Sequence, residues 1–283
     1  MSRGFVRARR LGERDYEPAL ALLRRSPEEN LVLVDFVERL REAPLAGESA
    51  PQVFGAFDGD RPIGLACAGR GLALSAAMPD PALEALRPLL LRVPSGLIKS
   101  DRGVVGNVWE TFERAGRRAT IDRIELAYRL RPEQLAAAAR SLPGFARPAR
   151  PEDLDDLVYA ARASLWEEGR PDPAETDPSG FRRWVEGRLG RARVVSQEGR
   201  TVFVAYADVR RPEGWLIQGV YTWPEVRRRG FARRGMDSVV REAFAAGATH
   251  VQLAVVDGND RATALYRGLG FEPFAELRTI LFH

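Results

Sequence analysis

The chain has 283 residues, of which 45% are hydrophobic, and its 43 basic residues nearly balance its 39 acidic ones to leave a net charge of +4. This length exceeds what one small domain needs and suits two hydrophobic cores. So small a net charge gives no indication of nucleic-acid binding.

Cysteine and histidine are too scarce for most metal or redox chemistry. The single cysteine, Cys67, excludes an intrachain disulfide, and two histidines give no plausible zinc cluster or Cys–His catalytic pair. Cys67 lies in an apolar strand pattern, which predicts a buried and unreactive thiol. The N-terminus lacks the apolar core of a signal peptide, and no stretch approaches about 18 apolar residues. We therefore expect a cytoplasmic protein that binds neither a metal nor a membrane.

The first half of the chain predicts a small unit of mixed helices and strands. The expected elements are a strand over Phe5–Arg10, a helix over Tyr16–Arg25, a hairpin of Val53–Phe57 and Ile63–Ala68, a short strand over Gly96–Ile98, a helix over Val104–Arg114 and a strand over Ile121–Leu130. The turn Asp58-Gly59-Asp60 between the two hairpin strands supplies the residue types that tight turns prefer.

A segment rich in proline and glycine, residues 141–151, follows an alanine-rich helix expected over Pro132–Arg140. We place a domain boundary there, so that the two predicted domains are residues 1–144 and 145–283. The elements expected in the second domain are a helix that opens over Pro151–Leu157, a helix over Ser179–Leu189, strands over Ala192–Gln197, Thr201–Asp208 and Trp215–Thr222, a helix over Arg233–Ala246, a strand over His250–Val256, a short helix over Arg261–Arg267 and a closing strand over Pro273–Phe282.

The most informative segment is a basic turn that joins the strand ending at Thr222 to a helix that begins near Gly230. The first N–H groups of a helix have no intrahelical partner, and the helix dipole is positive at that end, so a phosphate group satisfies both. Gly230 lets the backbone approach a ligand closely, and arginines at positions 227–229 add positive charge. The turn therefore predicts a pyrophosphate site.

The same turn reads Arg227-x-x-Gly230-x-Ala232, which resembles the acyl-CoA signature of the GNAT superfamily of N-acetyltransferases, Gln/Arg-x-x-Gly-x-Gly/Ala. A second segment, from Asn259 through Tyr266 to Phe271, is similar to that family's Asn-x-x-Ala-x-x-Leu-Tyr-x-x-x-Gly-Phe motif. The two motifs occur in the family's order, and the elements of the second domain follow the order of a complete GNAT domain.

This resemblance implies an α+β fold of two GNAT-like domains, each a twisted, mostly antiparallel sheet flanked by helices. It also implies an acetyl-CoA site in the second domain. The implied cofactor-binding residues are Val220, Tyr221 and Thr222 of the strand, Arg227, Arg228, Arg229, Gly230, Phe231, Ala232 and Arg233 of the turn and helix start, and Asn259. Asn259 also fits a helix N-cap, and the two roles are compatible.

The resemblance further implies a transfer reaction without a covalent enzyme intermediate. The pantetheine arm would pair with Val220–Thr222, a strand N–H near Gly219 or Val220 would polarise the thioester carbonyl, and an amine would attack it. Tyr266 would protonate the departing thiolate, because a phenol with a pKa near 10 keeps its proton at neutral pH. A phenol at this position would otherwise be a half-buried packing residue.

The acceptor amine and its general base stay open. The acidic segments 166–168 and 175–177 could attract an ammonium group or be solvated loops, and Glu213, Gln218 or a bound water could act as the base. Trp215 and Trp223 could line the acceptor site or merely pack.

Neither motif occurs in the first half, which we interpret as a degenerate GNAT-like domain; tandem acyltransferases with one silent half, such as mycothiol synthase, occur in the superfamily. The alternatives to an amine acetyltransferase are a mycothiol-synthase-like acyltransferase and a non-catalytic acyl-CoA sensor or scaffold. The sequence leaves the choice between monomer and homodimer open.

Overall fold

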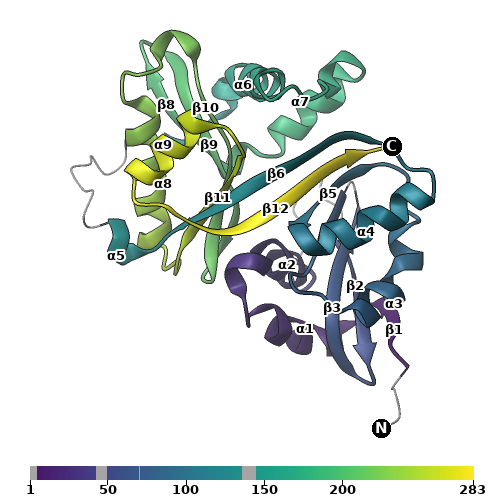
Figure 1. Ribbon diagram of the computed structural model, residues 1–283. Helices are drawn as coiled ribbons and strands as arrows, with labels where there is room; N and C mark the ends of the chain where they lie inside the picture. Colours follow the sequence, from purple (N-terminus) through teal and green to yellow (C-terminus); the bar gives the residue numbers. More distant parts are fainter. Residues whose placement is uncertain (1–4, 43–49, 70, 136–144) are drawn as a thin grey trace. The chain divides into compact units, whose positions relative to one another are not determined.

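The structure is a computed structural model that describes residues 5–42, 50–69, 71–135 and 145–283 (Figure 1). The chain divides into two compact units. Unit 1 comprises Met1–Ala127, Val255–Gly258 and Pro273–His283, and unit 2 comprises Tyr128–Ala254 and Asn259–Glu272. The two units are therefore not simply consecutive in sequence, because short C-terminal segments belong to unit 1.

Unit 1 is built on a mixed sheet whose strands lie in the order β1-β2-β3-β4-β5-β12-β6. The pairs from β1 to β4 are antiparallel, β4 and β5 are parallel, and β12 runs antiparallel to β5. The strands are β1 (Arg7–Arg10), β2 (Gln52–Asp58), β3 (Arg61–Ala68), β4 (Gly71–Leu74), β5 (Gly96–Asp101), β6 (Ala119–Leu130) and β12 (Glu272–Phe282).

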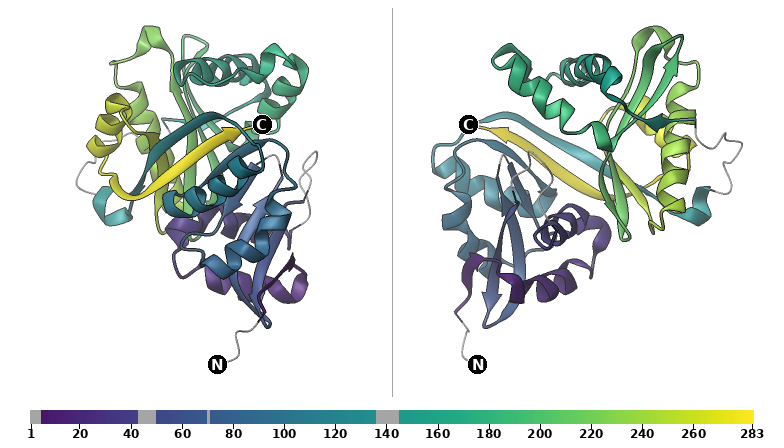
Figure 2. Two further views of the ribbon diagram at one scale, coloured as in Figure 1. Left: turned by 45° about the vertical axis from the view of Figure 1, so that its right-hand side comes forward. Right: turned by 180° about the vertical axis from the view of Figure 1, so that it is seen from behind.

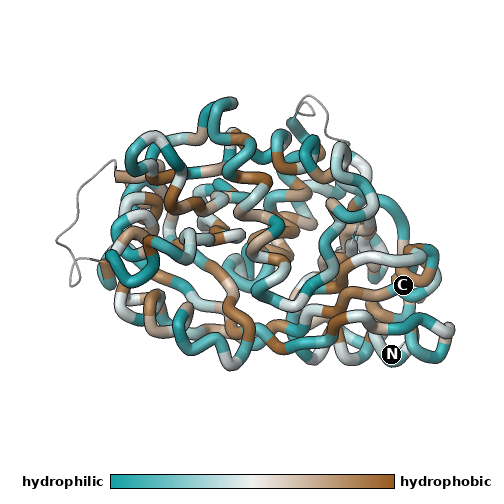
Figure 3. Tube along the Cα trace, turned by 90° about the horizontal axis from the view of Figure 1, so that it is seen from above, coloured by the Kyte–Doolittle hydropathy of each residue, from teal (hydrophilic) through white to brown (hydrophobic). Residues whose placement is uncertain are grey.

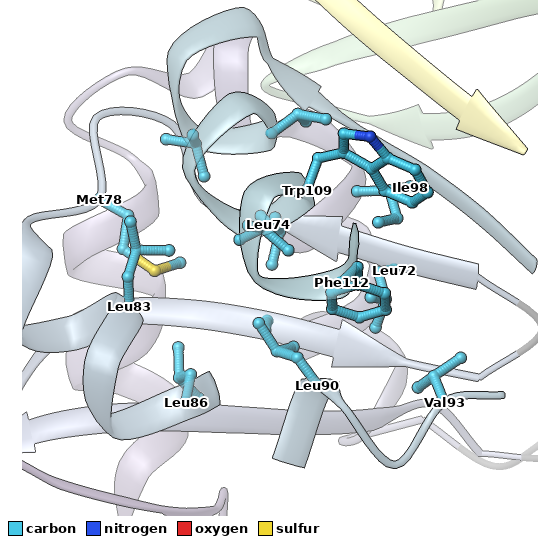
Figure 4. Close-up of a cluster of buried hydrophobic side chains, with 14 of the residues drawn as sticks. Leu72, Leu74, Met78, Leu83, Leu86, Leu90, Val93, Ile98, Trp109 and Phe112 are labelled. Atoms are coloured by element: carbon cyan, nitrogen blue, oxygen red, sulfur yellow. The ribbon is translucent and has the colours of Figure 1, made fainter. Parts of the chain in front are cut away.

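Two hydrophobic cores cover the two faces of this sheet. The helices α1 (Tyr16–Leu23) and α2 (Pro27–Arg39) pack on one face, and α3 (Asp80–Leu90) and α4 (Arg102–Arg114) pack on the other. In the second core, drawn in Figure 4, the rings of Trp109 and Phe112 lie 6.1 and 5.1 Å from the ring of Phe282. Burial of each such side chain contributes about 1.5–3 kcal/mol. The C-terminal strand is thus part of the core of unit 1.

Unit 2 contains the remaining strands of the sheet, in the order β11-β10-β9-β8-β7. Its strands are β7 (Arg147–Pro148), β8 (Ala192–Gln197), β9 (Arg200–Arg211), β10 (Gly214–Thr222) and β11 (Val251–Val256). All neighbouring pairs are antiparallel except β10 and β11, which are parallel. This is the same sequence of pairings that β1 to β5 have in unit 1.

The helices of unit 2 lie on both faces of its sheet (Figures 1 and 2). They are α5 (Pro132–Leu135), α6 (Leu154–Glu167), α7 (Pro178–Glu186), α8 (Phe231–Ala245) and α9 (Asp260–Gly268). Helices α6 and α7 lie together on one face of β9 and β10, and α8 lies on the other. The side chain of Asp177 caps α7 by accepting a hydrogen bond from the Gly180 N–H at 2.8 Å.

An arginine–aspartate pair occurs at the same point of both units. Arg9 of β1 pairs with Asp15 ahead of α1, and Arg147 of β7 pairs with Asp153 ahead of α6; each pair spans six residues. Each aspartate also accepts a hydrogen bond from the backbone N–H three residues before it, at 2.8 and 2.7 Å. The arginine holds the pKa of its aspartate below the usual range in both cases. The two units therefore share this side-chain contact as well as their strand order.

The strand β12 pairs with β5 from Leu277 opposite Asp101 to Phe282 opposite Gly96. Lys99 of β5 and Glu125 of β6 form an ion pair across β12, in which the Lys99 Nζ lies 2.5 Å from a carboxylate oxygen of Glu125. Burial opposes ionisation of Glu125, but Lys99 more than offsets it, and the pKa of this carboxyl falls to about 2.

The predicted α+β class and the two GNAT-like, mostly antiparallel sheets are confirmed. Unit 1 also contains α2, α3 and β4, which the sequence reading did not predict. The strand expected from Phe5 begins at Arg7, and the expected helix Pro132–Arg140 is described only as α5, since residues 136–140 lie outside the described residues. The boundary at residue 144 stays a prediction.

Among the described residues, no helix is long and apolar enough to cross a membrane. Along the trace in Figure 3 the hydrophobic stretches, in brown, are short and alternate with hydrophilic ones.

Candidate active site

The strand β10 has one edge that is only partly paired. Its parallel pairing with β11 is confined to Trp215 opposite Val251 and Leu216 opposite Gln252, although β10 continues to Thr222 and β11 to Val256. Within the described part of the chain, β10 therefore has no β-partner on this side beyond Leu216. The backbone of its second half is available to pair with an extended ligand.

The same half of β10 is irregular. Its pairing with β9 shifts register between Gln218 and Tyr221, and Gly219 within this bulge has a φ of +56°, a conformation that favours glycine. Gln218 and Gly219 are exposed. A Cβ atom at Gly219 would lie 2.9 Å from the Tyr206 ring, so a side chain there would have to displace that ring.

The basic turn follows directly. After Pro224–Val226, Arg228 has a φ of +63° and Gly230 a φ of +83°, and Gly230 is the N-cap residue of α8 without a capping side chain. Among the described residues, no protein acceptor receives a hydrogen bond from the backbone N–H groups of residues 228–233. These donors, at the positive end of a 15-residue helix, are suited to a phosphate group.

The arginines of the turn are not equivalent. Arg228, Arg229 and Arg233 are exposed, and an Arg233 terminal nitrogen donates to the Gly268 carbonyl oxygen of α9 at 3.2 Å. Arg227 instead points back along the strand: its Nε donates to the Thr222 carbonyl oxygen at 2.8 Å. Three of the four arginines therefore remain available to an anion, whereas Arg227 fixes the turn.

Arg227 also contacts the end of α6. One of its terminal nitrogens lies 2.5 Å from the Glu167 carboxylate, and its guanidinium packs over the Tyr221 ring at 5.4 Å. Burial, together with the neighbouring Glu167 carboxylate, raises the pKa of Tyr221 to about 12. Sequence reasoning missed this cluster, because no local pattern indicates which partner a long arginine side chain will choose.

The remaining residues of the first motif shape the start of α8. Phe231 is buried, and its ring stacks on that of Phe145 with 6.5 Å between centroids. Ala232 is half-buried. Val220 and Thr222 are half-buried as well, and Tyr221 is buried. The structure thus brings the predicted residues 220–222 and 227–233 together in one continuous segment.

Asn259 is the N-cap of α9, and its side-chain oxygen accepts a hydrogen bond from the Ala262 N–H at 3.1 Å. The predicted capping role is confirmed, and the predicted ligand contact stays a prediction. Tyr266, further along α9, is only 6% exposed and packs edge-on against Phe271. Burial raises the pKa of its phenol above the ordinary value, so Tyr266 keeps its proton at every physiological pH.

The residues that the sequence suggested for the acceptor site and the general base lie at different distances from the bulge of β10. Glu213 lies in the turn before β10, about six residues and so roughly 20 Å along the strand from the bulge. Trp215 is buried and paired within the sheet. Trp223 lies at the other end of β10, between the rings of Tyr159 and Tyr221 at 6.1 and 5.3 Å. Gln218 and Trp223 are thus the candidates near the bulge.

The acidic segments named from the sequence mostly have structural partners. Glu167 pairs with Arg227, Glu168 lies 3.7 Å from Arg170, and Asp177 caps α7. Among the described residues, no group of three or more histidine, cysteine, aspartate or glutamate side chains could hold a metal ion. Cys67 is buried, and burial raises the pKa of its thiol to about 11.

Two repeats of a mixed sheet, each with helices on both faces, define a tandem α+β protein. Residues 156–271 match the model of the acetyltransferase (GNAT) family. The match lies within the second half of the chain and identifies a GNAT acetyltransferase domain there.

Solved structures agree on the fold. A Drosophila protein is similar over 98% of both chains, with a TM-score of 0.71 and 16% identity. A GCN5-related N-acetyltransferase from Sphaerobacter thermophilus is similar over 97% of this chain and 94% of its own, with a TM-score of 0.60 and 18% identity. A tandem GNAT protein from the clavulanic acid biosynthesis pathway matches over 98% of this chain and 97% of its own, with a TM-score of 0.56 and 16% identity. No curated protein matches the sequence.

Proposed function

We propose that the protein transfers an acetyl group from acetyl-CoA to an amine acceptor, and that the reaction takes place in unit 2. The observation that carries this proposal is the second half of β10, an unpaired strand edge with a bulge at Gly219 that leads straight into a turn of unpartnered N–H groups. The match of residues 156–271 to the GNAT family model supports an acyl-CoA donor.

The donor would lie along β10 and across the turn. The amide groups of a pantetheine arm pair with the edge at Val220–Thr222 in the manner of an added strand. Its pyrophosphate accepts hydrogen bonds from the N–H groups of residues 228–233, while the exposed Arg228, Arg229 and Arg233 add charge-assisted contacts. Asn259 contributes a further polar contact at the start of α9.

The bulge would supply the electrophilic assistance. A backbone N–H near Gly219 or Val220 donates to the thioester oxygen and stabilises the negative charge that develops as the amine attacks. The amine nitrogen forms a bond to the carbonyl carbon, the C–S bond breaks, and the thiolate leaves. Holding both substrates in one orientation lowers the entropic part of the barrier.

Tyr266 would act as the general acid. Its raised pKa keeps the phenol protonated, so that it can give its proton to the departing CoA sulfur. Before attack the acceptor ammonium loses a proton to bulk solvent through water held by the exposed Gln218, since Glu213 lies at the far end of β10.

The test is release of free CoA thiol from acetyl-CoA across a panel of amines, amino acids, aminoglycosides and peptides, with a no-acceptor control and calorimetric binding of acetyl-CoA alongside. We expect micromolar-range binding and acceptor-dependent thiol release with at least one amine. Binding without turnover for every acceptor would contradict transfer and favour a sensor. Absence of binding would contradict the site itself.

A further inference from the structure

Helices α3 and α4 of unit 1 border an open groove on the face of the sheet opposite to α1 and α2. Its volume is about 210 Å³. Three of the side chains that line it, Leu83, Val108 and Phe112, are buried members of the core drawn in Figure 4, so the groove has an apolar floor. Pockets for drug-sized ligands measure roughly 300–1,000 Å³, and this groove therefore suits a smaller molecule, of about the size of a single amino acid.

The rim of the groove is polar, and most of its side chains have no protein partner. Asp80, Glu84 and Arg87 of α3 are exposed and line the groove from one side. Asn107 and Thr111 of α4 line it from the other. Within the described parts of the chain, none of these five side chains forms a hydrogen bond or an ion pair. Charges of both signs are thus available above an apolar floor.

The two opposite charges nearest each other on α3 stay apart. Residues three or four apart on a helix have Cβ atoms about 5–6 Å from each other, and opposite charges at this spacing commonly pair. On the α4 side of the groove Glu110 and Arg114 do so, at 3.1 Å. Glu84 and Arg87 form no such pair among the described residues. Both are therefore free to contact a ligand that carries a positive and a negative charge close together.

A proline adds a backbone acceptor on α3. Pro88 lies inside this helix and has no N–H, so the carbonyl oxygen of Glu84, four residues earlier, lacks its usual helical donor. Together with the carboxylates of Asp80 and Glu84, this oxygen gives the first two turns of α3 more hydrogen-bond acceptors than an ordinary helix surface has. An ammonium group, with three N–H donors, matches them.

The corresponding helices of unit 2 are bridged instead. Helices α8 and α9 follow β10 and β11 as α3 and α4 follow β4 and β5. A terminal nitrogen of Arg233 on α8 donates to the Gly268 carbonyl oxygen of α9 at 3.2 Å and spans the space between the two helices. The groove of unit 1 is therefore set by the side chains of α3 and α4 and does not follow from the strand order that the units share.

We propose that the groove between α3 and α4 binds a free α-amino acid with an apolar side chain. The ammonium group contacts Asp80 and Glu84, and the carboxylate contacts Arg87. The side chain of the amino acid lies on the apolar floor. An α-amino acid carries its two charges on one carbon and its neighbour, which matches the spacing of Glu84 and Arg87 on the helix. This site lies within unit 1 and does not depend on the transfer reaction proposed for unit 2.

The test is calorimetric titration of the full-length protein with L-leucine and with L-phenylalanine. At least one of them should bind with a dissociation constant of about 1 mM or lower. Leucinamide lacks the carboxylate and 4-methylpentanoate lacks the ammonium group, so each should bind more weakly than leucine by roughly 3- to 10-fold.

Two variants locate the binding. Arg87→Gln should weaken leucine binding by roughly 3- to 10-fold and leave leucinamide binding unchanged. Its matched control is Arg92→Gln, at an exposed arginine two residues after α3 and outside the groove, which should change neither. Thr111→Trp, at a half-exposed position, should fill the groove and abolish binding, whereas Glu113→Trp, at an exposed position of α4 outside the groove, should not.

Thermal melting checks that the variants are folded, and Arg87→Gln decides alone if Thr111→Trp unfolds. No binding of either amino acid, or equal binding of leucine and leucinamide, would overturn the proposal. Leucine binding that is unchanged in Arg87→Gln and in Thr111→Trp would mean that the amino acid binds elsewhere, and it would overturn the site as well. The release of CoA thiol from acetyl-CoA is a separate measurement, so the transfer reaction stands or falls independently of these results.

Discussion

In both units a turn and a helix follow the corresponding strand, which is β4 in unit 1 and β10 in unit 2. The two turns differ in how many of their backbone N–H groups have a protein partner. In unit 1 the Ser75 N–H donates to Leu65, and the Ala76 N–H donates to the side chain of the buried Asn30. Helix α3 then starts with Pro79 as its N-cap and with Pro81 in its first turn, and neither proline has an N–H.

Charge follows the same division. The first turn of α3 carries Asp80, whose carboxylate itself complements the positive end of the helix, whereas the turn before α8 carries three exposed arginines. Unit 1 therefore shares the topology of unit 2, but two N–H groups of its turn have protein partners. The N–H groups of residues 228–233 in unit 2 have no such partner among the described residues.

The largest effect should come from Tyr266→Phe, because this change removes the proposed general acid. The corresponding helix of unit 1, α4, has no tyrosine. The ring and its contact with Phe271 are kept, so the fold should be unchanged. General acid catalysis contributes about 10²- to 10⁴-fold, so kcat should fall by that factor while the dissociation constant of acetyl-CoA stays constant. Steady-state kinetics and calorimetry check both parts, and full turnover by the variant would exclude the phenol as the acid.

The next effect concerns the open turn. Gly230→Glu places a charged side chain with an unfavourable backbone conformation beside the proposed pyrophosphate, so acetyl-CoA binding should weaken more than about tenfold. The matched control is Gly247→Glu, at an exposed glycine with a φ of +86° after α8 and no atom near its Cβ position. Equal loss of binding in the two variants, both folded, would mean that strain and not the site explains the result.

The smallest effect should be shared by both units. Asp15→Asn and Asp153→Asn each remove a charge-assisted hydrogen bond, so each should lower the free energy of unfolding by roughly 1–3 kcal/mol at pH 7. Because each aspartate has a pKa lowered from the usual value near 4, its contribution is complete above that pH and is lost as the pH falls through the folded-state pKa. The variants and the wild type should therefore converge in acid.

Urea unfolding at pH 7 and pH 3, together with acetyl-CoA binding, checks this equivalence. A loss of unfolding free energy in only one of the two variants would show that the two arginine–aspartate pairs are not equivalent. A change in affinity for acetyl-CoA in Asp15→Asn would show that unit 1 takes part in binding.

Features set by residues close in sequence were predictable. The turn from Pro224 to Arg233 and the cap at Asn259 follow from residue types at fixed spacing, and the structure has the expected strand, turn and helix there. The helices α2 and α3 were missed although Pro27 and Asp80 are ordinary helix-start residues, since the apolar runs that follow them were not read as helical faces.

Features set by distant partners were not predictable. The pairing of β12 with β5 joins strands whose local patterns say nothing about each other, because strand pairing is non-local. The contact of Arg227 with Glu167 depends on the rotamer of a long side chain, and so does the packing of Arg188 over the Tyr206 ring. Alternation along β9 marks Tyr206 only as a buried strand residue.

The place of β12 in unit 1 has a consequence for synthesis on the ribosome. The ion pair between Arg102 and Glu276 joins residues 174 positions apart, and all of the unit 2 segments are translated between them. At about 5–20 residues per second, β5 waits roughly 10–35 s for its neighbour to emerge. During that interval the edge of β5 has no partner strand and can pair with other chains. The nascent first unit is therefore the species that a ribosome-associated chaperone would protect.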